Sequence, residues 1–294
     1  YLAGNIGRPA LEILPLLKQH SLVVLELSSF QLQDLTISPA VAVVLDIFQD
    51  HLDAHASLKE YLSAKKNIAR YQTAGNRVFY FANNRHSREI ARPGLAKKIA
   101  VSPMNFSLFK KDELKIPGDH NFRNAVMAAT VALALDCPKE IVRETAMSFN
   151  GVEHRLELVR SWRAPDGRLM DFYNDSASTN PQTMIAAGQA FVRPTILIAG
   201  GHDKNLNYGD LAKALRRTAV KTVLLFGANK LKIKKALKRF PAILCDDLPA
   251  AVKAAVAQAP NGGVVVLSPG AASFDMFRDY ADRGRQFKQL INNL

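Results

Sequence analysis

The chain has 294 residues, of which 48% are hydrophobic and 22% charged, and its formal net charge is +13. This composition is typical of a folded globular protein and excludes an intrinsically disordered chain. The length fits two domains better than one. No apolar run approaches the length of a membrane span and no signal peptide is recognisable, so we expect no membrane attachment.

The two cysteines and the excess of positive charge narrow the classes further. Cys137 and Cys245 lie far apart and outside any C-x-x-C pattern, which indicates neither a disulfide framework nor a zinc site and favours a cytoplasmic protein. Much of the charge falls in runs such as NKLKIKKALKRF, residues 229–240, for which a solvated helix face is the simplest interpretation. No aromatic interleaving accompanies it, so we expect no nucleic-acid binding; attraction of an anionic nucleotide substrate explains the charge equally well.

In chain order, the first half alternates helical and strand patterns. Residues 8–19 and 57–72 predict helices, and residues 21–29, 39–47 and 76–83 predict buried strands. A further long helix begins at about Asp119, a plausible N-cap. This is the βαβ rhythm of a largely parallel sheet.

The pattern changes near residues 150–156, where we place a boundary between one domain of residues 1–153 and another of residues 154–294. A hairpin around Pro165-Asp166-Gly167 opens the second domain. Strand patterns follow at residues 195–201, 222–227, 242–247 and 263–270, with helices between them. The sequence therefore predicts two α/β units joined by a short linker.

Two adjacent lysines, Lys65 and Lys66, fall on different faces of the helix predicted at residues 57–72. A capping box of Ser57 and Glu60 starts this helix. Counted from there, Lys65 lies within an apolar stripe, whereas Lys66 points toward solvent. An ammonium on an apolar stripe is costly unless it snorkels, finds a partner or loses its charge. The helical pattern alone leaves open whether Lys65 snorkels or has a functional role.

Polar residues gather where the predicted strands end, which is where open α/β sheets bind their ligands. Glu26 could hold Mg²⁺ or simply cap the next turn, and clusters rich in acidic side chains at strand ends are candidate metal or phosphate sites. The residues in question are Glu26, Ser28 and Ser29; Asp46, Asp50, His51, Asp53 and His55; His120, Asn121 and Asn124; Asp175, Ser176, Ser178, Thr179 and Asn180; His202, Asp203 and Lys204; and Ser268 and Ser273.

A series of short motifs occurs along nearly the whole chain in a characteristic order. They are GNIG, ELSSFQL, DHLD, AKKNIA, HNFRNA, EHR, NDSASTN, GGHDK and LSPGAASFDMF. In this series the chain resembles the Mur ligases, and most of all the branch that adds D-glutamate. The resemblance implies a central P-loop-type ATPase-like domain with a mostly parallel sheet, followed by a Rossmann-like C-terminal domain.

The resemblance also implies a reaction and its cofactors. ATP phosphorylates the carboxylate of UDP-N-acetylmuramoyl-L-alanine, and the amine of D-glutamate then attacks the acyl phosphate, in peptidoglycan precursor synthesis. Two Mg²⁺ ions are expected, with Glu26, His51 and Lys65 as catalytic and metal-binding residues. Lys65 matches the lysine that the family carbamylates, and burial on an apolar stripe would favour the neutral amine which that modification needs.

The motifs also imply which further residues bind the nucleotide and the substrates. For ATP these are Asn124, Arg155 and, at the ribose, Asp175. For the muramoyl substrate they are Asn5 and Ser28. For D-glutamate they are Thr179, Lys204, Ser273, Phe274 and Tyr280. We expect the protein to act as a monomer.

Three departures from the family pattern are visible. The P-loop, G-T-x-G-K-[ST], and the N-terminal domain that grips the UDP moiety are absent and would lie before Tyr1, so the chain looks truncated. Ala177 replaces the basic residue of the D-S-K-A-T-N motif, and Asp46 stands where the family usually has Asn. Three alternatives stay open: another Mur-type ligase or a folylpolyglutamate synthase, a non-catalytic nucleotide-binding remnant, and a basic nucleic-acid binder.

Without the loop that cradles the phosphates, we expect this chain by itself to be inactive or nearly so. A steady-state assay with ATP, D-glutamate and the muramoyl substrate checks this. Ligation at a normal rate by the chain alone would contradict it.

Overall fold

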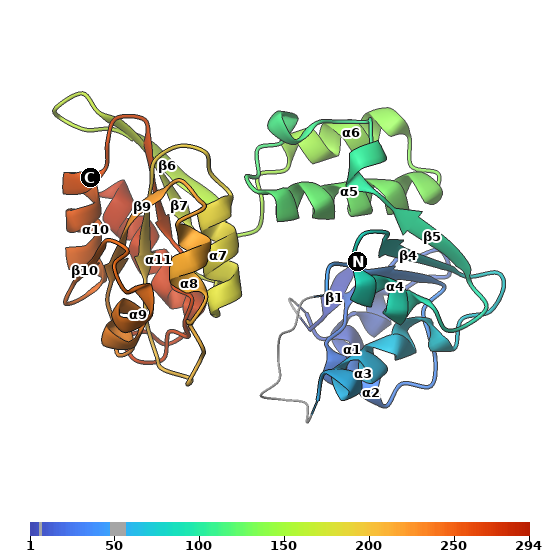
Figure 1. The fold of residues 1–294 in the computed structure, drawn as a ribbon. Helices are drawn as coiled ribbons and strands as arrows, with labels where there is room; N and C mark the ends of the chain where they lie inside the picture. Colours follow the sequence, from blue (N-terminus) through green and yellow to red (C-terminus); the bar gives the residue numbers. More distant parts are fainter. Residues whose placement is uncertain (6–7, 48–56) are drawn as a thin grey trace. The chain divides into compact units, whose positions relative to one another are not determined.

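The computed structural model describes residues 1–5, 8–47 and 57–294. By its internal contacts the chain divides into two compact units (Figure 1). Unit 1 comprises Tyr1–Ser107 and Asn124–Val142, and unit 2 comprises Leu108–Arg123 and Arg143–Leu294. The chain thus enters unit 2 twice, and the simple boundary between residues 153 and 154 stays a prediction.

Unit 1 is built on parallel strands. One sheet pairs β1 with β2, and a second has the order β3-β4-β5, all parallel. Its elements are β1 (Leu2–Gly4), α1 (Ala10–Ile13), the 3-10 turn η1 (Leu14–Leu16), β2 (Val24–Glu26), α2 (Ser29–Gln33), β3 (Val41–Val44), α3 (Leu58–Arg70), β4 (Arg77–Phe81), α4 (Arg85–Ala91), β5 (Lys97–Val101) and η2 (Pro103–Asn105). Helices α5 (Asp119–Ala134) and α6 (Lys139–Ser148) contribute residues to both units.

The core of unit 1 lies between the three-stranded sheet and helices α3 and α4. Ala42, Val78, Leu62 and Ile90 belong to this apolar cluster. By contrast, Val24 and Leu25 of β2 are 58% and 44% exposed. The prediction of a buried strand at residues 21–29 is therefore wrong for burial, because among the described residues β2 pairs only with the short β1.

Polar side chains fix how the elements of unit 1 join. Ser57 caps α3 by accepting a hydrogen bond from the Glu60 amide at 3.2 Å. Asn67 of α3 donates from its amide nitrogen to the carbonyls of Leu32 and Gln33, both at 2.9 Å. These bonds satisfy carbonyls at the end of α2, which have no partner inside that helix, and they fasten α2 to α3.

Unit 2 contains one six-stranded sheet in the order β10-β9-β8-β11-β7-β6, parallel except for the β6–β7 hairpin. Its elements are η3 (Lys111–Glu113), β6 (Glu157–Arg163), β7 (Leu169–Asn174), α7 (Pro181–Gln189), β8 (Thr195–Ala199), α8 (Leu211–Leu215), β9 (Val220–Leu225), α9 (Lys230–Leu237), β10 (Ala242–Leu244), α10 (Leu248–Gln258), β11 (Gly263–Leu267) and α11 (Tyr280–Asn292).

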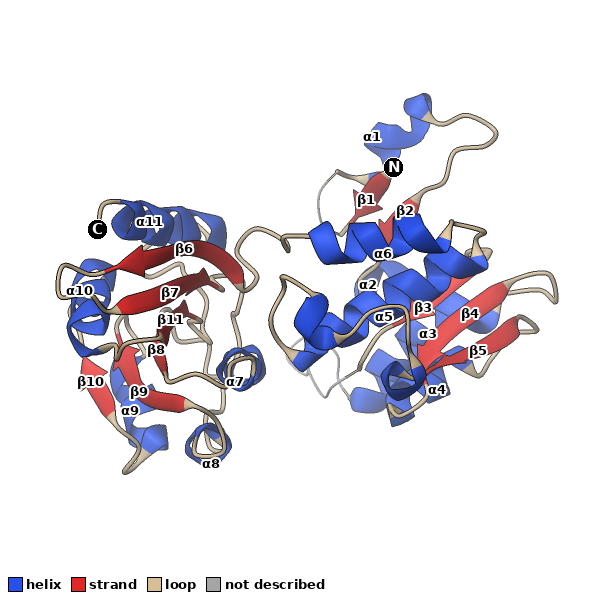
Figure 2. Cartoon of the chain, turned by 90° about the horizontal axis from the view of Figure 1, so that it is seen from above, coloured by secondary structure: helices blue, strands red, loops and turns tan. Residues whose placement is uncertain are grey.

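Helices cover both faces of this sheet (Figure 2). One apolar cluster joins the sheet to α7, α8 and α9, and a second joins it to α10 and α11. Strands β8 and β11 are buried along their whole length, which explains their continuous runs of apolar residues. The predicted mostly parallel α/β class is confirmed. No helix among the described residues is long and apolar enough to cross a bilayer.

Candidate active site

Parallel pairing of β1 and β2 places Asn5 beside Glu26 in unit 1. Gly4 pairs with Glu26, and the Asn5 amide donates to the Glu26 carbonyl at 2.8 Å. Gly4 has φ +119°, and a Cβ on it would lie 2.2 Å from the Glu26 oxygen. Only glycine fits this close approach. The backbone therefore brings together two of the predicted site residues.

Ser28, two residues after Glu26, has a structural role that the sequence analysis did not assign to it. Its hydroxyl accepts a hydrogen bond from the Gln31 amide at 3.2 Å, and the Gln31 side chain accepts one from the Ser28 amide at 2.9 Å. This capping box starts α2. Any contact of Ser28 with a substrate would add to its role as a cap.

Lys65, on α3, is a second charged residue near Glu26. Its side chain is half-buried on α3, and its ammonium lies over the Tyr61 ring, 5.2 Å from the centroid. Burial lowers the pKa of Lys65, and the nearby Glu26 carboxylate partly offsets this by raising it. The structure thus brings Glu26 and Lys65 together and makes the neutral amine easier to form.

Lys66 differs from its prediction. It is not a solvated surface charge: its side chain is 27% exposed and its ammonium lies 2.7 Å from a carboxylate oxygen of Glu89 on α4. The hydrogen bond from Lys66 is the main reason why the pKa of Glu89 lies below its usual value. Lys66 therefore links α3 to α4. Helix periodicity alone could not reveal that Glu89 is its partner.

The remaining predicted residues of unit 1 are less constrained. His51 lies outside the described residues. Asp46, one of the departures from the family pattern, accepts a hydrogen bond from the Asn84 side chain at 3.1 Å, so its carboxylate helps to fix the start of α4. Asn124 is exposed on α5.

In unit 2, Asp175 follows the last residue of β7 and is only 8% exposed. Its carboxylate accepts hydrogen bonds from the Ser268 hydroxyl at 2.8 Å and from the Leu156 amide at 3.2 Å. Burial raises the pKa of Asp175 to about 7, although these hydrogen bonds and the charges of Arg155 and Arg283 act in the opposite direction. The group can therefore change its charge near neutral pH.

Arg155 lies exposed in a strained loop just before β6. The residues on either side, His154 and Leu156, have φ of 65° and 44°, the left-handed region that costs a residue with a side chain about 1 kcal/mol or more. In this conformation the Leu156 amide donates to Asp175, and the Arg155 charge lies close enough to oppose the rise in the pKa of Asp175. The structure thus brings Arg155 and Asp175 together.

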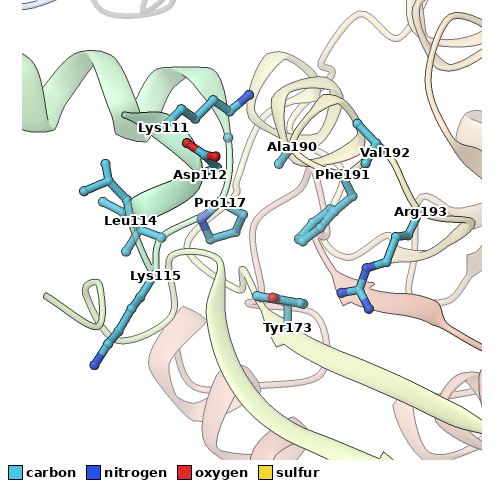
Figure 3. A pocket seen from close by; sticks show the side chains of 12 residues that line it. Lys111, Asp112, Leu114, Lys115, Pro117, Tyr173, Ala190, Phe191, Val192 and Arg193 are labelled. Atoms are coloured by element: carbon cyan, nitrogen blue, oxygen red, sulfur yellow. The ribbon is translucent and has the colours of Figure 1, made fainter. Parts of the chain in front are cut away.

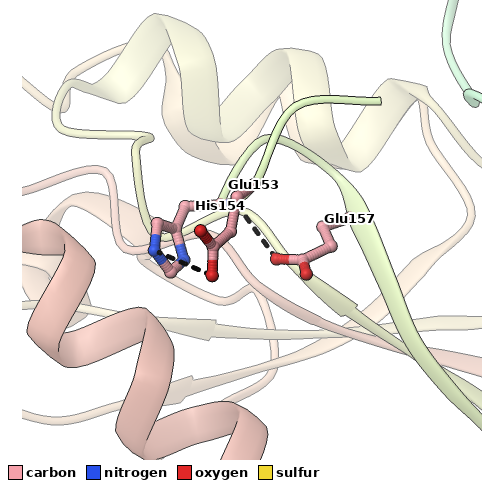
Figure 4. A group of neighbouring side chains, drawn as sticks. All are labelled: Glu153, His154 and Glu157. Atoms are coloured by element: carbon pink, nitrogen blue, oxygen red, sulfur yellow. Dashed lines mark hydrogen bonds and ion pairs between the residues drawn. The ribbon is translucent and has the colours of Figure 1, made fainter. Parts of the chain in front are cut away.

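Next to Arg155, the side chains of Glu153, His154 and Glu157 converge (Figure 4), with possible metal-ligand atoms within 4.8 Å of one another. The Lys288 ammonium already lies 2.6 Å from Glu157 and 3.1 Å from Glu153. The Asn174 amide lies 2.8 Å from His154 Nδ1. We interpret the group as an ion-pair network that ties the loop to α11.

The residues expected at a D-glutamate site gather at the same edge of the unit 2 sheet. Lys204 follows β8, and its ammonium lies over the Phe274 ring at 5.7 Å from the centroid. An isolated bridge between His202 and Ala272 joins the two loops that carry them. Ser273 is buried, whereas Tyr280 is 45% exposed at the start of α11. Thr179 is partly exposed in the loop after β7.

Sequence reasoning missed Arg283, which is fully buried on α11. Its guanidinium donates to the Ser176 hydroxyl and carbonyl at 2.9 and 2.8 Å, and to the carbonyls of Ala271 and Ala272 at 3.1 and 3.2 Å. Burial lowers the pKa of Arg283 to about 10. Arg283 therefore holds the loop after β7 against the loop after β11, and with them Asp175 and Ser273.

A separate cavity of about 510 Å³ in unit 2 contains none of the predicted site residues. Figure 3 shows Tyr173 and Phe191 on one side and Leu114 and Pro117 on the other. The two aromatic rings are 4.7 Å apart. Of the predicted residues in unit 2, Asp175, Thr179, Lys204, Ser273 and Phe274 lie on loops that follow strands β7, β8 and β11.

The raised pKa of Asp175 predicts how stability depends on pH. The folded protein keeps a proton on Asp175 up to about pH 7, while the unfolded chain releases it near pH 4, so stability falls as pH rises between these values. We expect Asp175→Asn to increase the free energy of unfolding at pH 8 by about 2–4 kcal/mol and to flatten the pH dependence.

Denaturant unfolding of the chain at several pH values between 4 and 8.5 measures this. Asp246→Asn, at an exposed aspartate of the same unit, is the matched control and should change the free energy of unfolding at pH 8 by no more than about 0.5 kcal/mol. A loss of stability at pH 8 in Asp175→Asn would contradict the account.

Comparison with known proteins assigns the chain to a family. The Mur ligase middle domain matches residues 9–107, and the Mur ligase glutamate ligase domain matches residues 154–271. The UDP-N-acetylmuramoylalanine–D-glutamate ligase of Acetivibrio thermocellus is 39% identical and that of Clostridium acetobutylicum 38% identical. Each similarity covers 100% of this chain and 68% of the relative.

Solved structures share the fold at much lower identity. The UDP-N-acetylmuramate-alanine ligase of Thermotoga maritima has a TM-score of 0.64 at 20% identity, covering 92% of this chain and 64% of that one. The folylpolyglutamate synthase of Mycobacterium tuberculosis has a TM-score of 0.62 at 15% identity, covering 90% and 68%. With both domain models matched in order and the relatives aligned along its whole length, this chain belongs to the Mur ligase family.

Proposed function

We propose that this protein adds D-glutamate to UDP-N-acetylmuramoyl-L-alanine, using ATP, in peptidoglycan precursor synthesis. One observation carries the proposal: Lys204, Phe274 and Ser273 lie on neighbouring loops at the sheet edge that also holds Asp175. That edge belongs to a chain whose relatives bear the name UDP-N-acetylmuramoylalanine–D-glutamate ligase.

The chemistry proceeds in two displacements. A carboxylate oxygen of the muramoyl substrate attacks the γ-phosphorus of ATP, and ADP leaves. The amine of D-glutamate then attacks the acyl carbon, phosphate leaves with its electron pair, and the amine loses a proton. Both steps need charge neutralisation at the phosphates and an oriented amine, which positioned cations and close loops provide.

The residues of unit 2 bind and orient. Asp175, as a carboxylate, would accept hydrogen bonds from the ribose hydroxyls of ATP, and Arg155 would contact the nucleotide together with Asn124 of unit 1. Lys204 would pair with a carboxylate of D-glutamate as a point charge. Ser273 and Thr179 offer hydroxyl groups to the same ligand, while Phe274 and Tyr280 would wall the site with their rings.

The residues of unit 1 could bind Mg²⁺ if Lys65 carries a carbamate. Glu26 supplies a carboxylate oxygen, the ligand that Mg²⁺ prefers, but the Lys65 ammonium supplies none. A carbamate on Lys65, formed by its neutral amine and CO₂ with loss of a proton, would supply two oxygens. We therefore assign Glu26 to one Mg²⁺ and a carbamylated Lys65, with His51, to the other, while Asn5 and Ser28 would contact the muramoyl substrate. Mg²⁺, when bound, would neutralise charge on the transferred phosphate.

Two further features stay proposals: a monomeric protein, and a cytoplasmic location, for which the free cysteines Cys137 and Cys245 give support.

The amino acid added is tested by ligation assays of the whole protein with D-glutamate, L-glutamate and L-lysine. We expect product with D-glutamate and a rate at least 100-fold lower with the others, because a site that pairs Lys204 and the loop hydroxyls with the carboxylates of D-glutamate would leave those groups unpaired with another amino acid. A preference for L-glutamate would favour the folylpolyglutamate synthase alternative, and ATP binding without product would favour a non-catalytic protein.

The lysine doublet provides a matched pair of variants in the whole protein. Lys65→Ala should lower kcat at least 1,000-fold, because it removes the amine beside Glu26, and should leave the melting temperature nearly unchanged. Lys66→Ala should keep kcat within about threefold and lower stability by about 1 kcal/mol or less, the loss expected for a part-exposed ion pair. Equal losses of kcat in the two variants would show that Lys65 has no special role.

A further inference from the structure

Four of the six residues that line a second cavity of unit 2 carry a positive charge. It has a volume of about 290 Å³ and lies between α8 and the end of α9, two helices that contact each other. We call it the basic hollow. Its lining consists of Gly209, Ala212, Lys213, Arg216, Arg217 and Lys238.

The four cations of the basic hollow have no carboxylate partner among the residues that the structure describes. No carboxylate lines it, and within the described part of the chain none of the four forms an ion pair, whereas the nearby Lys232 pairs with Asp203. Residues 210–240 hold ten lysines and arginines and one aspartate, and so account for nine of the thirteen net positive charges of the chain. Like charges held this close repel one another, which an anionic ligand would relieve.

Lys238 adds an observation independent of charge. It ends α9 with φ 54° and ψ −113°, a backbone conformation that glycine adopts readily and that strains any residue with a Cβ. A glycine is the usual solution after the last turn of a helix. The sequence instead places an ammonium there, at the wall of the basic hollow.

Shape and chemistry limit the ligand. Arg216 and Arg217 offer planar forks of donors that match phosphate oxygens, and the two lysines add point charges. No aromatic side chain lines the hollow, so bases of a single-stranded nucleic acid have nothing to stack on. No large apolar side chain lines it either, as insertion into a membrane interface would require. The hollow suits a small ligand with several phosphates.

We propose that the basic hollow is a binding site for a compact polyphosphate group, either inorganic or the phosphate chain of a nucleotide. None of its residues belongs to the ligase site assigned above, so the site is separate from that of the reaction.

Isothermal titration of the whole protein with sodium tripolyphosphate, without Mg²⁺ and at 0.15 M salt, tests the proposal. The double variant Arg216→Gln/Arg217→Gln should weaken binding at least tenfold. The matched control Lys235→Gln/Arg239→Gln removes two exposed charges from the same stretch but outside the hollow, and should weaken it no more than twofold. Equal weakening in both would mean diffuse attraction to a charged face and would overturn the site.

Lys238→Gly separates binding from folding. It should weaken tripolyphosphate about threefold while keeping or raising the melting temperature, because glycine relieves the backbone. Unchanged affinity in this variant would contradict the proposal.

Competition then identifies the ligand. Displacement of tripolyphosphate by ATP, with the loss again confined to the Arg216/Arg217 variant, would show that a nucleotide can supply the phosphates, and failure of ATP to displace it would assign the hollow to inorganic polyphosphate. Tighter binding through these residues to a duplex oligonucleotide or to vesicles with anionic lipid would overturn the compact ligand.

Discussion

Parallel pairing brings the carboxyl ends of neighbouring strands to the same edge of a sheet, and most of the candidate active site depends on this constraint. In unit 1 the register that aligns Gly4 with Glu26 sets Asn5 beside Glu26. In unit 2 the loops after β7, β8 and β11 meet at one edge because β11 pairs with both β7 and β8. Residues nearly a hundred positions apart, such as Asp175 and Ser268, thereby come into hydrogen-bond contact.

The site is built from ionisable side chains placed where water is scarce. Lys65 and Asp175 have pKa values shifted by burial toward their neutral forms, while Arg283 keeps its charge by donating to neutral carbonyls and a hydroxyl. Removing a charge from water is costly unless partners compensate. The fold tolerates this cost at Arg283, which joins two loops, and at Lys65 and Asp175, which lie among the predicted ligand-binding residues. Side chains with strongly shifted pKa values often cluster at functional sites.

Much of this arrangement is predictable from sequence because it follows local patterns. Ser57 and the apolar stripe predict α3 to within two residues, and runs of β-branched residues predict β8 and β11. Short elements with mixed composition, such as β5 with its two lysines, give no such pattern, and the exposure of β2 depends on what lies beside it. The ion pair of Lys66 with Glu89 is a long-range contact that no local rule contains.

The sequence contains a pattern from which the burial of Arg283 could have been predicted. Tyr280, Arg283 and Phe287 recur at the helical spacing of α11, as Tyr61, Lys65 and Ile68 do on α3. In both helices a cation falls on an apolar stripe: Arg283 is fully buried and hydrogen-bonded there, and Lys65 is half-buried. The family motifs predict Lys204 and Phe274 as D-glutamate-binding residues, but only the structure shows that these two side chains meet.

The central claim is that burial beside Glu26 makes Lys65 chemically different from its neighbour. The most direct measurement is ¹³C NMR of the whole protein equilibrated with ¹³C-labelled bicarbonate, with Lys65→Ala and Lys66→Ala as controls. We expect a carbamate resonance that is lost in Lys65→Ala and retained in Lys66→Ala. A spectrum without this resonance, or one in which it persists in Lys65→Ala, would contradict it.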